Sequence, residues 1–394
     1  MMAARAGSPA PADHLGPLDG LRGIAIALVV WFHVWQITWL PANLTLFGAT
    51  LNFNWICEDG FVGVDLFFFI SGFCIFYPYA RTLFDGKPRQ SLATFAYRRA
   101  IKILPSYVFV IAVSIAVGWA TFASPLDEVK QIVLHLLFIH TFWDQSYGSI
   151  NGVLWSLATE VQFYVLFPFV CWAVLRRPWL TFGAMIVIAN AYRLAVANNY
   201  DVVHQMDQLP GTLDLFAGGM LAAYLYRLIG TRAPALAARR VLWTLVAAGG
   251  SVAFYAILQG DFNARQIVGW PENWIVYGRP ELVVAFFTLA LGSLFAFPLW
   301  QRALANRLLV FLSAISYNLY LWHQPVARAL LLAHLPPWTG HNETSDPHWG
   351  LAYSFLSMGA AVAVAALVTY GFERPLMQRR PSAAFEREGL METT

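Results

Sequence analysis

The stretch GIAIALVVWFHVWQITWL, residues 23–40, decides the fold class of this chain, because it has the composition of a helix surrounded by lipid. It contains no Asp, Glu, Lys or Arg and is long enough to cross the hydrocarbon core of a bilayer. His33 lies eleven residues after Arg22, which is about 16 Å along a helix. If Arg22 marks the membrane surface, His33 lies near the middle of a core about 30 Å thick. An imidazole at that depth is costly, so we expect His33 to have a functional role.

The composition extends this interpretation to the whole chain. Its 394 residues are 58% hydrophobic and only 12% charged, whereas soluble domains carry about 25% charged residues. We therefore predict an all-α, multi-pass membrane protein, surrounded by membrane lipids. The three cysteines, Cys57, Cys74 and Cys171, have neither the spacing of a disulfide framework nor that of metal ligands. We expect no metal and no nucleic-acid partner.

Hydrophobic runs predict about ten membrane-spanning helices and one helix that does not span. The predicted spans are residues 21–40, 60–80, 103–123, 152–175, 179–197, 212–229, 241–258, 280–300, 308–334 and 350–372. The segment 129–147 carries several polar side chains, and we expect it to form a helix that lies at the outer face or dips into it. Of the 25 Lys and Arg residues, this arrangement puts 20 on the inner side, and leaves on the outer side or at span ends only Lys130, Arg193, Arg265, Arg279 and Arg328. The positive-inside rule then places both termini in the cytoplasm.

The chain divides into one transmembrane domain, residues 18–375, and two tails. Residues 1–17 are rich in Ala and Pro, contain no cleavable signal peptide and are expected to be disordered. Residues 376–394 are expected to form a cytoplasmic tail.

Two acidic side chains fall inside predicted spans. Glu160 lies about 12 Å along a helix that starts near residue 152 at the outer face. A buried carboxylate is neutral or pairs with a cation or an imidazole, so we expect Glu160 to pair with His33 or to hold substrate. Asp65 enters the second span from outside, and it suits either a helix-packing contact or a substrate contact.

Three cations, Arg98, Arg99 and Lys102, lie close together where the third span begins. We expect them at the start of a helix, where cationic side chains suit a ligand that carries phosphate. Arg22, on the same side, is either a surface anchor or a part of this site.

The segment ISYNLYLWHQP, residues 315–325, carries a partly shared polar face. Tyr317, Tyr320 and His323 recur every three residues. Pro325 frees a backbone carbonyl, which is typical of an irregular helix that forms a site. The alternative is an aromatic anchor at the membrane interface.

The residues alone leave two functions open. A basic site inside, a histidine and a carboxylate at mid-depth and polar groups toward the outside suit transfer of a group from a phosphorylated cytoplasmic donor to an acceptor on the other face. The same arrangement suits a proton-coupled transporter of a small polar or acylated solute.

Six sequence blocks, in the same order, resemble the acyltransferase-3 family of membrane O-acyltransferases. They are LDGLRGIA (18–25) followed by Phe32-His33, GFVGVDLFFFISGF (60–73), FAYRRAIKILPSY (95–107), LWSLATEVQFY (154–164), ISYNLYLWHQP (315–325) and FERP (372–375). Arg22 and His33 match the family's Arg-x10-His pair. Arg99 and Lys102 match its basic pair ahead of the proline, with Lys where the family more often has Arg.

The resemblance implies an acyl-CoA-dependent O-acyltransferase of the bacterial inner membrane, which O-acetylates a polysaccharide, a lipopolysaccharide or another lipid-linked saccharide. Acetyl-CoA is the usual donor. We expect its phosphates to bind the basic side chains Arg22, Arg98, Arg99 and Lys102. His33 would act as general base or carry the acyl group itself, with Glu160 orienting the imidazole. The side chains expected to contact substrate are Asp65, Ser71, Trp155, Tyr317 and His323.

Overall fold

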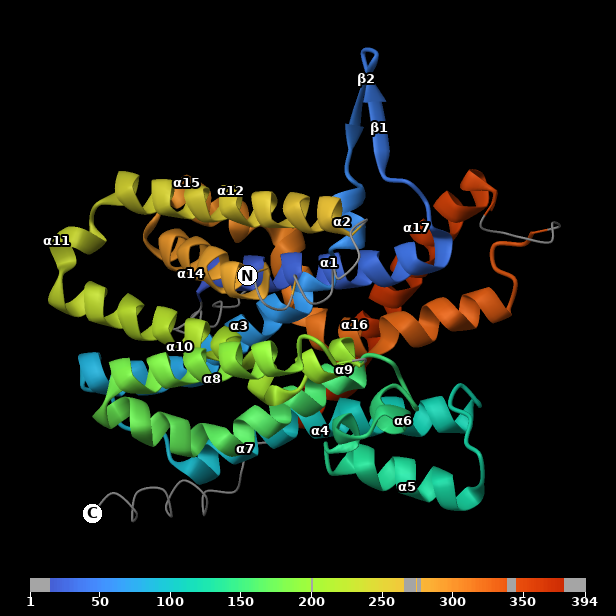
Figure 1. The fold of residues 1–394 in the computed structure, drawn as a ribbon, viewed down its shortest axis with the longest axis horizontal. Coiled ribbons are helices and arrows are strands. Elements are labelled where there is room, and N and C mark those ends of the chain that lie inside the picture. Colours follow the sequence, from blue (N-terminus) through green and yellow to red (C-terminus); the bar gives the residue numbers. More distant parts are fainter. Residues whose placement is uncertain (1–14, 200, 266–273, 275–277, 339–344, 379–394) are drawn as a thin grey trace, which may run out of the picture.

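Long helices, most of them side by side, make up the protein (Figure 1). The computed structural model describes residues 15–199, 201–265, 274, 278–338 and 345–378. The long helices are α1 (Gly16–Thr38), α3 (Val62–Asp85), α4 (Leu92–Ala116), α7 (Leu154–Arg176), α8 (Pro178–Val196), α10 (Leu209–Arg232), α12 (Arg240–Ala264), α14 (Arg279–Phe295), α16 (Arg307–Leu332) and α17 (Pro347–Val368). The shorter elements are β1 (Asn43–Leu46), β2 (Ala49–Asn52), α2 (Asn54–Glu58), α5 (Pro125–Leu136), η1 (His140–Phe142), α6 (Asp144–Tyr147), α9 (Val202–Met206), α11 (Pro234–Ala237), α15 (Pro298–Leu304), η4 (Thr369–Glu373) and α18 (Arg374–Met377).

The described part of the chain contains eight to nine candidate membrane spans rather than the ten predicted. Eight helices are long and apolar enough to cross a bilayer, and α15 with α16, bent by 46°, makes the ninth candidate. The predicted span 280–300 is interrupted, because α14 has only 17 residues and ends at Phe295. A helix that crosses a bilayer usually needs about 20 residues.

Helix α14 nevertheless carries the chain from one end of the bundle to the other. Its first residue, Arg279, contacts Asp65 in the first turn of α3. At its last residues, the carbonyls of Phe295 and Ala296 accept hydrogen bonds from Arg240, at the start of α12. The chain therefore passes between the two ends at α14, even though this helix is short.

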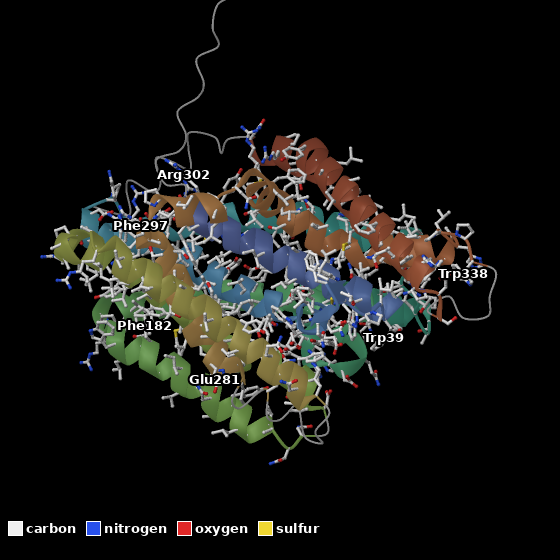
Figure 2. All side chains as sticks on the ribbon, turned by 90° about the horizontal axis from the view of Figure 1, so that it is seen from above. Trp39, Phe182, Glu281, Phe297, Arg302 and Trp338 are labelled. Atoms are coloured by element: carbon white, nitrogen blue, oxygen red, sulfur yellow. The ribbon has the colours of Figure 1, made fainter. Side chains whose placement is uncertain are left out.

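We call the end where α1, α4, α12 and α16 begin the basic end, and the other the opposite end. Figure 2 shows Arg302 at the basic end, and Trp39 and Trp338 at the opposite end. Glu373, in η4, forms an ion pair with Lys102 of α4, so the chain returns after α17 to the end where α1 begins. That both termini are cytoplasmic stays a prediction.

The two predicted tails, 1–17 and 376–394, lie largely outside the described residues. Gly16 and Pro17, assigned to the first tail, form the start of α1. Proline fits the first turn of a helix, where its missing N–H has no partner to lose. The helix therefore begins before the predicted boundary at residue 18.

The segment 129–147 was predicted to be one helix that does not span the membrane. It does not span, but it consists of three short elements rather than one helix. Helix α5 has 12 residues, and η1 and α6 follow it. Figure 1 shows α5 and α6 beside the long helices, at the opposite end. Its position at the outer face of a membrane stays a prediction.

A short hairpin is the one departure from the all-α expectation in the described residues. β1 pairs with β2 antiparallel, from Asn43 opposite Asn52 to Leu46 opposite Ala49. The two-residue loop, Phe47 and Gly48, has φ values of 52° and 83°. Positive φ at both loop residues is typical of the turns that join twisted strands.

Helices α3 and α10 approach each other closely because glycines face both sides of their contact. A Cβ atom on Gly219 would lie 1.8 Å from the carbonyl oxygen of Phe69, and one on Gly72 would lie 2.3 Å from that of Phe216. Small residues allow this backbone contact between membrane helices. It places α3, which carries Asp65 and Ser71, in the centre of the bundle. Of the 18-residue apolar stretch of this helix, 78% is buried.

Candidate active site

Two histidines from distant parts of the sequence meet between α1 and α16. The Nε2 atom of His323 lies 2.9 Å from Nδ1 of His33. The side chain of His323 is buried, with 1% exposure, whereas His33 is half-buried. The structure therefore brings together two predicted site residues from helices that are far apart in the sequence.

Backbone acceptors fix the tautomers of this pair in its neutral form. Nδ1 of His323 lies 3.0 Å from the carbonyl oxygen of Leu319, so it must carry the proton. Nε2 of a neutral His323 is then an acceptor, and Nδ1–H of His33 is the donor between the rings. The carbonyl of Val29, 3.0 Å away, is a second acceptor for the same proton. Nε2 of His33 is left with a free lone pair.

Both histidines line a cavity of about 440 Å³. Its other polar lining residues are Gln36, Ser114, Ser149, Asn151, Gln324 and Arg328, and Trp119 supplies an aromatic wall. Residues 148–152, which follow α6, form one side of it. The cavity therefore belongs to the opposite end of the bundle.

Pro325 frees a carbonyl, as the sequence predicts, and the structure provides a replacement donor. The proline lies inside α16, which continues to Leu332. Nδ2 of Asn151 donates to the carbonyl oxygen of Leu321 over 3.0 Å. This hydrogen bond joins the cavity wall to the helix that carries His323. No sequence motif pointed to Asn151.

Glu160 does not contact His33 among the described residues, contrary to the expected pairing. The hydroxyl of Tyr164 donates to its carboxylate over 2.5 Å, and Ser71 lies 2.9 Å from the same hydroxyl. The physical reason is helical: Tyr164 lies four residues after Glu160, on the same face of α7. The partner of His33 is another imidazole instead.

Glu160 belongs to a second polar group, nearer the basic end. Arg22 donates to the sulfur of Cys74 over 3.5 Å. Its guanidinium group is also attracted electrostatically by the carboxylates of Asp19 and Glu160. The guanidinium of Arg99 lies 5.7 Å from the ring centre of Tyr164. We call Arg22, Ser71, Cys74, Arg99, Glu160 and Tyr164 the inner polar cluster. In this cluster, Arg22 and Arg99, which are expected to bind the phosphates of the acyl donor, lie near the carboxylate of Glu160.

The three cations of α4 are not at a helix N-terminus, so that part of the expectation is wrong. Ser91 caps the helix, which starts at Leu92 and places Arg98 in its second turn. Arg98 is exposed and Arg99 half-buried. Nε of Arg99 is buried without a hydrogen-bond partner among the described residues. Any phosphate bound here would meet side chains, because the free backbone N–H groups lie nearly two turns away.

Lys102 pairs with Glu373, a residue for which the sequence analysis predicts no role. It forms an ion pair with Glu373, whose other oxygen accepts from Nδ2 of Asn318 over 2.7 Å. Glu373 is 2% exposed and ends a π-helical turn. Such turns are frequent at functional sites. A lone buried acid in the closing FERP block was the available signal, because it requires a cation or a donor.

Tyr317 and Trp155 serve contacts between elements rather than the cavity. The Tyr317 hydroxyl donates to the carbonyl oxygen of Ile103 over 2.7 Å, joining α16 to α4. Trp155 stacks on Tyr147 of α6 with ring centres 5.7 Å apart. Neither residue lines the cavity that contains His33 and His323.

Asp65 is held in a buried ionic network. Nη2 of Arg279 lies 3.3 Å from oxygens of both Asp65 and Asp207. Tyr147 donates to Asp207 over 2.7 Å. The network joins α3, α14, α6 and the turn between α9 and α10 that holds Asp207, which favours the helix-packing role for Asp65 over the substrate contact.

A group of possible metal ligands occurs at the opposite end, but its histidine is already occupied. Atoms of Asp144, Asp201 and His204 lie within 4.8 Å of one another. Nδ1 of His204 contacts Asp201 over 2.7 Å, and its Nε2 contacts the carbonyl of Thr141 over 2.6 Å. Because both ring nitrogens face acceptors, a metal would have to displace one of them.

The sequence is similar to those of known acyltransferases. The family model described as an acyltransferase domain matches residues 16–370. The chain is 27% identical over 342 residues to the O-acetyltransferase OatA of Staphylococcus aureus (strain NCTC 8325 / PS 47), covering 79% of this chain and 50% of that protein. A putative O-acetyltransferase of S. aureus (strain COL) is 26% identical over 327 residues, covering 78% of this chain and 49% of that protein.

The chain thus spans about half the length of these curated relatives. No solved structure matches it. The family match covers nearly all of the described helices, and both the His33–His323 pair and the inner polar cluster lie within it. The chain belongs to the acyltransferase-3 family of membrane proteins.

Proposed function

We propose that the chain is a membrane O-acyltransferase that moves an acetyl group from acetyl-CoA to a hydroxyl of a glycan or lipid-linked saccharide. The donor would bind at the basic end and the acceptor would enter from the opposite end, in the inner membrane of a bacterium. The observation that carries this proposal is the His33–His323 pair in the wall of a cavity at that end. A half-buried imidazole with one free nitrogen suits a general base.

The chemistry needs one proton acceptor and one leaving group. Nε2 of His33 takes the proton of the acceptor hydroxyl as its oxygen attacks the thioester carbon. The C–S bond then breaks, and the CoA sulfur leaves with the proton that His33 carries. In the alternative route, Nε2 of His33 attacks the thioester first, the C–S bond breaks, and CoA leaves as its thiol with the Nδ1 proton of the acetylated imidazole. The acceptor oxygen then takes the acetyl group and its proton returns to His33, so that an acetyl-enzyme could be trapped between the two steps.

His323 acts through His33 as a positioning residue. Its Nε2 accepts the Nδ1–H of His33, which holds that ring in one tautomer and leaves Nε2 of His33 free. When His33 becomes an imidazolium, the same hydrogen bond faces an uncharged acceptor rather than a carboxylate. This differs from the usual carboxylate–histidine arrangement, in which an acid stabilises the charge.

The cations of α4 suit the phosphates of the donor. Arg98 is exposed, and the buried Nε of Arg99 has no hydrogen-bond partner in the part of the chain that the structure describes. Guanidinium groups bind phosphate through paired, charge-assisted hydrogen bonds. Lys102 would take part only if phosphate competes with Glu373 for its ammonium group.

The donor and acceptor regions are separate in this structure. Arg22, Arg98, Arg99 and Lys102 do not line the cavity, and Arg22 is about 16 Å along α1 from His33. The proposal therefore requires α1, α4 and α16 to part when the donor binds, so that the thioester reaches His33. The Tyr317 hydrogen bond between α16 and α4 is one contact that such an opening would break.

The experiment is release of CoA from acetyl-CoA by the purified protein, together with transfer of labelled acetyl to envelope glycans. Arg98→Glu with Arg99→Glu should weaken acetyl-CoA binding. The matched control is Arg302→Glu, which reverses an exposed charge at the same end. Gradient-driven solute uptake without any CoA release would refute the proposal and support a transporter.

A further inference from the structure

Arg328 differs from the other arginines at the opposite end of the bundle. Arg193 binds Asp214, Arg265 binds Asp59, and Arg279 binds Asp65 and Asp207. Arg328 makes one described polar contact, a donation over 3.4 Å to the carbonyl oxygen of Trp119. No described carboxylate pairs with it, although its side chain lines the cavity that contains His33.

The lining of this cavity contains no described acidic side chain that could neutralise the charge of Arg328. The seventeen described lining residues include Arg328 and two histidines, but neither Asp nor Glu. Arg328 is exposed, and it is the one Asp, Glu, Lys or Arg side chain among the described lining residues. The cavity therefore favours anions over neutral or cationic molecules.

Two side-chain amides line the same cavity as Arg328 and are available for hydrogen bonds to a ligand. Gln36 and Gln324 line the cavity and have no described hydrogen-bond partner. Asn151, in contrast, is committed to the Leu321 carbonyl. Each amide both donates and accepts, as a sugar hydroxyl does, and Trp119 adds to the lining an aromatic side chain of the kind that packs against a sugar. An uncharged alcohol with a single hydroxyl would leave these groups unpaired.

The spacing along α16 limits where the anionic group lies. Arg328 is five residues after His323, which is about 7.5 Å along the helix. His33 is in direct contact with His323. A negative charge held by Arg328 would therefore lie on the sugar that is acylated, or on the sugar next to it.

We infer that the acceptor is an anionic saccharide whose carboxylate or phosphate binds Arg328 while a nearby hydroxyl meets Nε2 of His33. This inference rests on the proposed O-acyltransferase function and names the substrate class of the same site. It makes Arg328 a residue that determines specificity.

The test measures CoA release from acetyl-CoA by the purified full chain with matched sugars. The acceptors are methyl β-D-glucopyranoside, methyl β-D-glucuronide and glucose 6-phosphate, with galactose and galacturonate as a second pair. At least one acidic sugar should stimulate release more than its neutral counterpart. The carboxylate and phosphate arms identify which acid is preferred.

Variants then assign the preference to one side chain. Arg328→Gln should lower the ratio of kcat/KM for the acidic over the neutral sugar about fivefold, mainly through KM. Arg328→Lys should keep part of the ratio. The matched control is Lys130→Gln, because Lys130 is an exposed cation at the same end that does not line the cavity.

The outcomes separate the two proposals. Equal or better use of neutral sugars, or an acidic preference that survives Arg328→Gln, would overturn the anionic acceptor and leave the acyltransferase intact. Absence of CoA release with every acceptor, and with isolated envelope glycans, would overturn both.

Discussion

Asn151 donates the hydrogen bond that Pro325 cannot provide to Leu321. In an unbroken helix the N–H of residue 325 would donate to the carbonyl of residue 321, and proline has no N–H. Nδ2 of Asn151 takes that place over 3.0 Å, and Asn151 is only 6% exposed. The loop that walls the cavity is therefore tied to α16 two residues before His323.

Removing this amide should loosen the cavity wall. Asn151→Ala leaves a buried carbonyl unsatisfied, which costs about 1–3 kcal/mol. We expect faster hydrogen exchange in residues 148–152 and a higher KM for the acceptor. Asn151→Asp is the informative companion, because it keeps the acceptor for the Val153 N–H but loses the donor. Unchanged exchange in both variants would show that the tie does not hold the loop.

The Lys102–Glu373 ion pair should act as a unit. Lys102→Met leaves a buried carboxylate with Asn318 as its remaining donor and should destabilise the protein by about 2 kcal/mol. Glu373→Gln leaves the cation without its partner. The double variant should lose less thermal stability than the sum of the single variants. Additive losses in a thermal-shift assay would mean that the pair contributes nothing beyond its separate residues.

The glycine contact between α3 and α10 should tolerate no side chain. Gly219→Ala places a methyl group against the Phe69 carbonyl and should cost about 3 kcal/mol by overpacking. Gly230→Ala, on the same helix with open space around it, should instead stabilise by about 1 kcal/mol. Thermal unfolding in detergent compares the two. Equal effects would contradict the close approach of these helices.

Acid should loosen the segment that contains α5 and η1. His135 and His140 stack with ring centres 3.8 Å apart, and burial lowers the pKa of His135 to about 4 and that of His140 to about 3. Both pKa values are depressed below 6.5, so the unfolded segment binds more protons below that pH. Stability should be constant above pH 6.5 and fall as the pH drops toward 4.

Hydrogen exchange of residues 125–147 as a function of pH measures this effect. Replacing both histidines by Gln should remove most of the pH dependence between 6.5 and 4. A dependence that persists in the double variant would assign the titration to other groups.

The sequence predicted the helices and the separate polar residues better than their contacts. Apolar runs located nearly every long helix, because each must present about 20 residues to lipid. They failed at 280–300, where a break after Phe295 leaves α14 with 17 residues. A run of apolar letters does not reveal whether the backbone is continuous through it.

In the candidate site, too, the sequence predicts the individual polar residues better than the contacts between them. His33 and His323 could each be recognised as polar residues inside a span, but they are 290 residues apart, and a single sequence does not say which helices are neighbours. Depth in the membrane alone suggests that Glu160 pairs with His33 or holds substrate. Tyr164, four residues along the same helix, was the nearer partner and was detectable from helical spacing.

The most direct test of the account is transfer of radiolabelled acetyl from acetyl-CoA to envelope glycans by purified His33→Ala, compared with His334→Ala. His334 is an exposed histidine just beyond α16 and does not line the cavity. We expect His33→Ala to transfer at least about 100-fold more slowly while it still binds CoA and folds, and His334→Ala to transfer at the parental rate. Transfer by His33→Ala at the parental rate would contradict the central role of this imidazole.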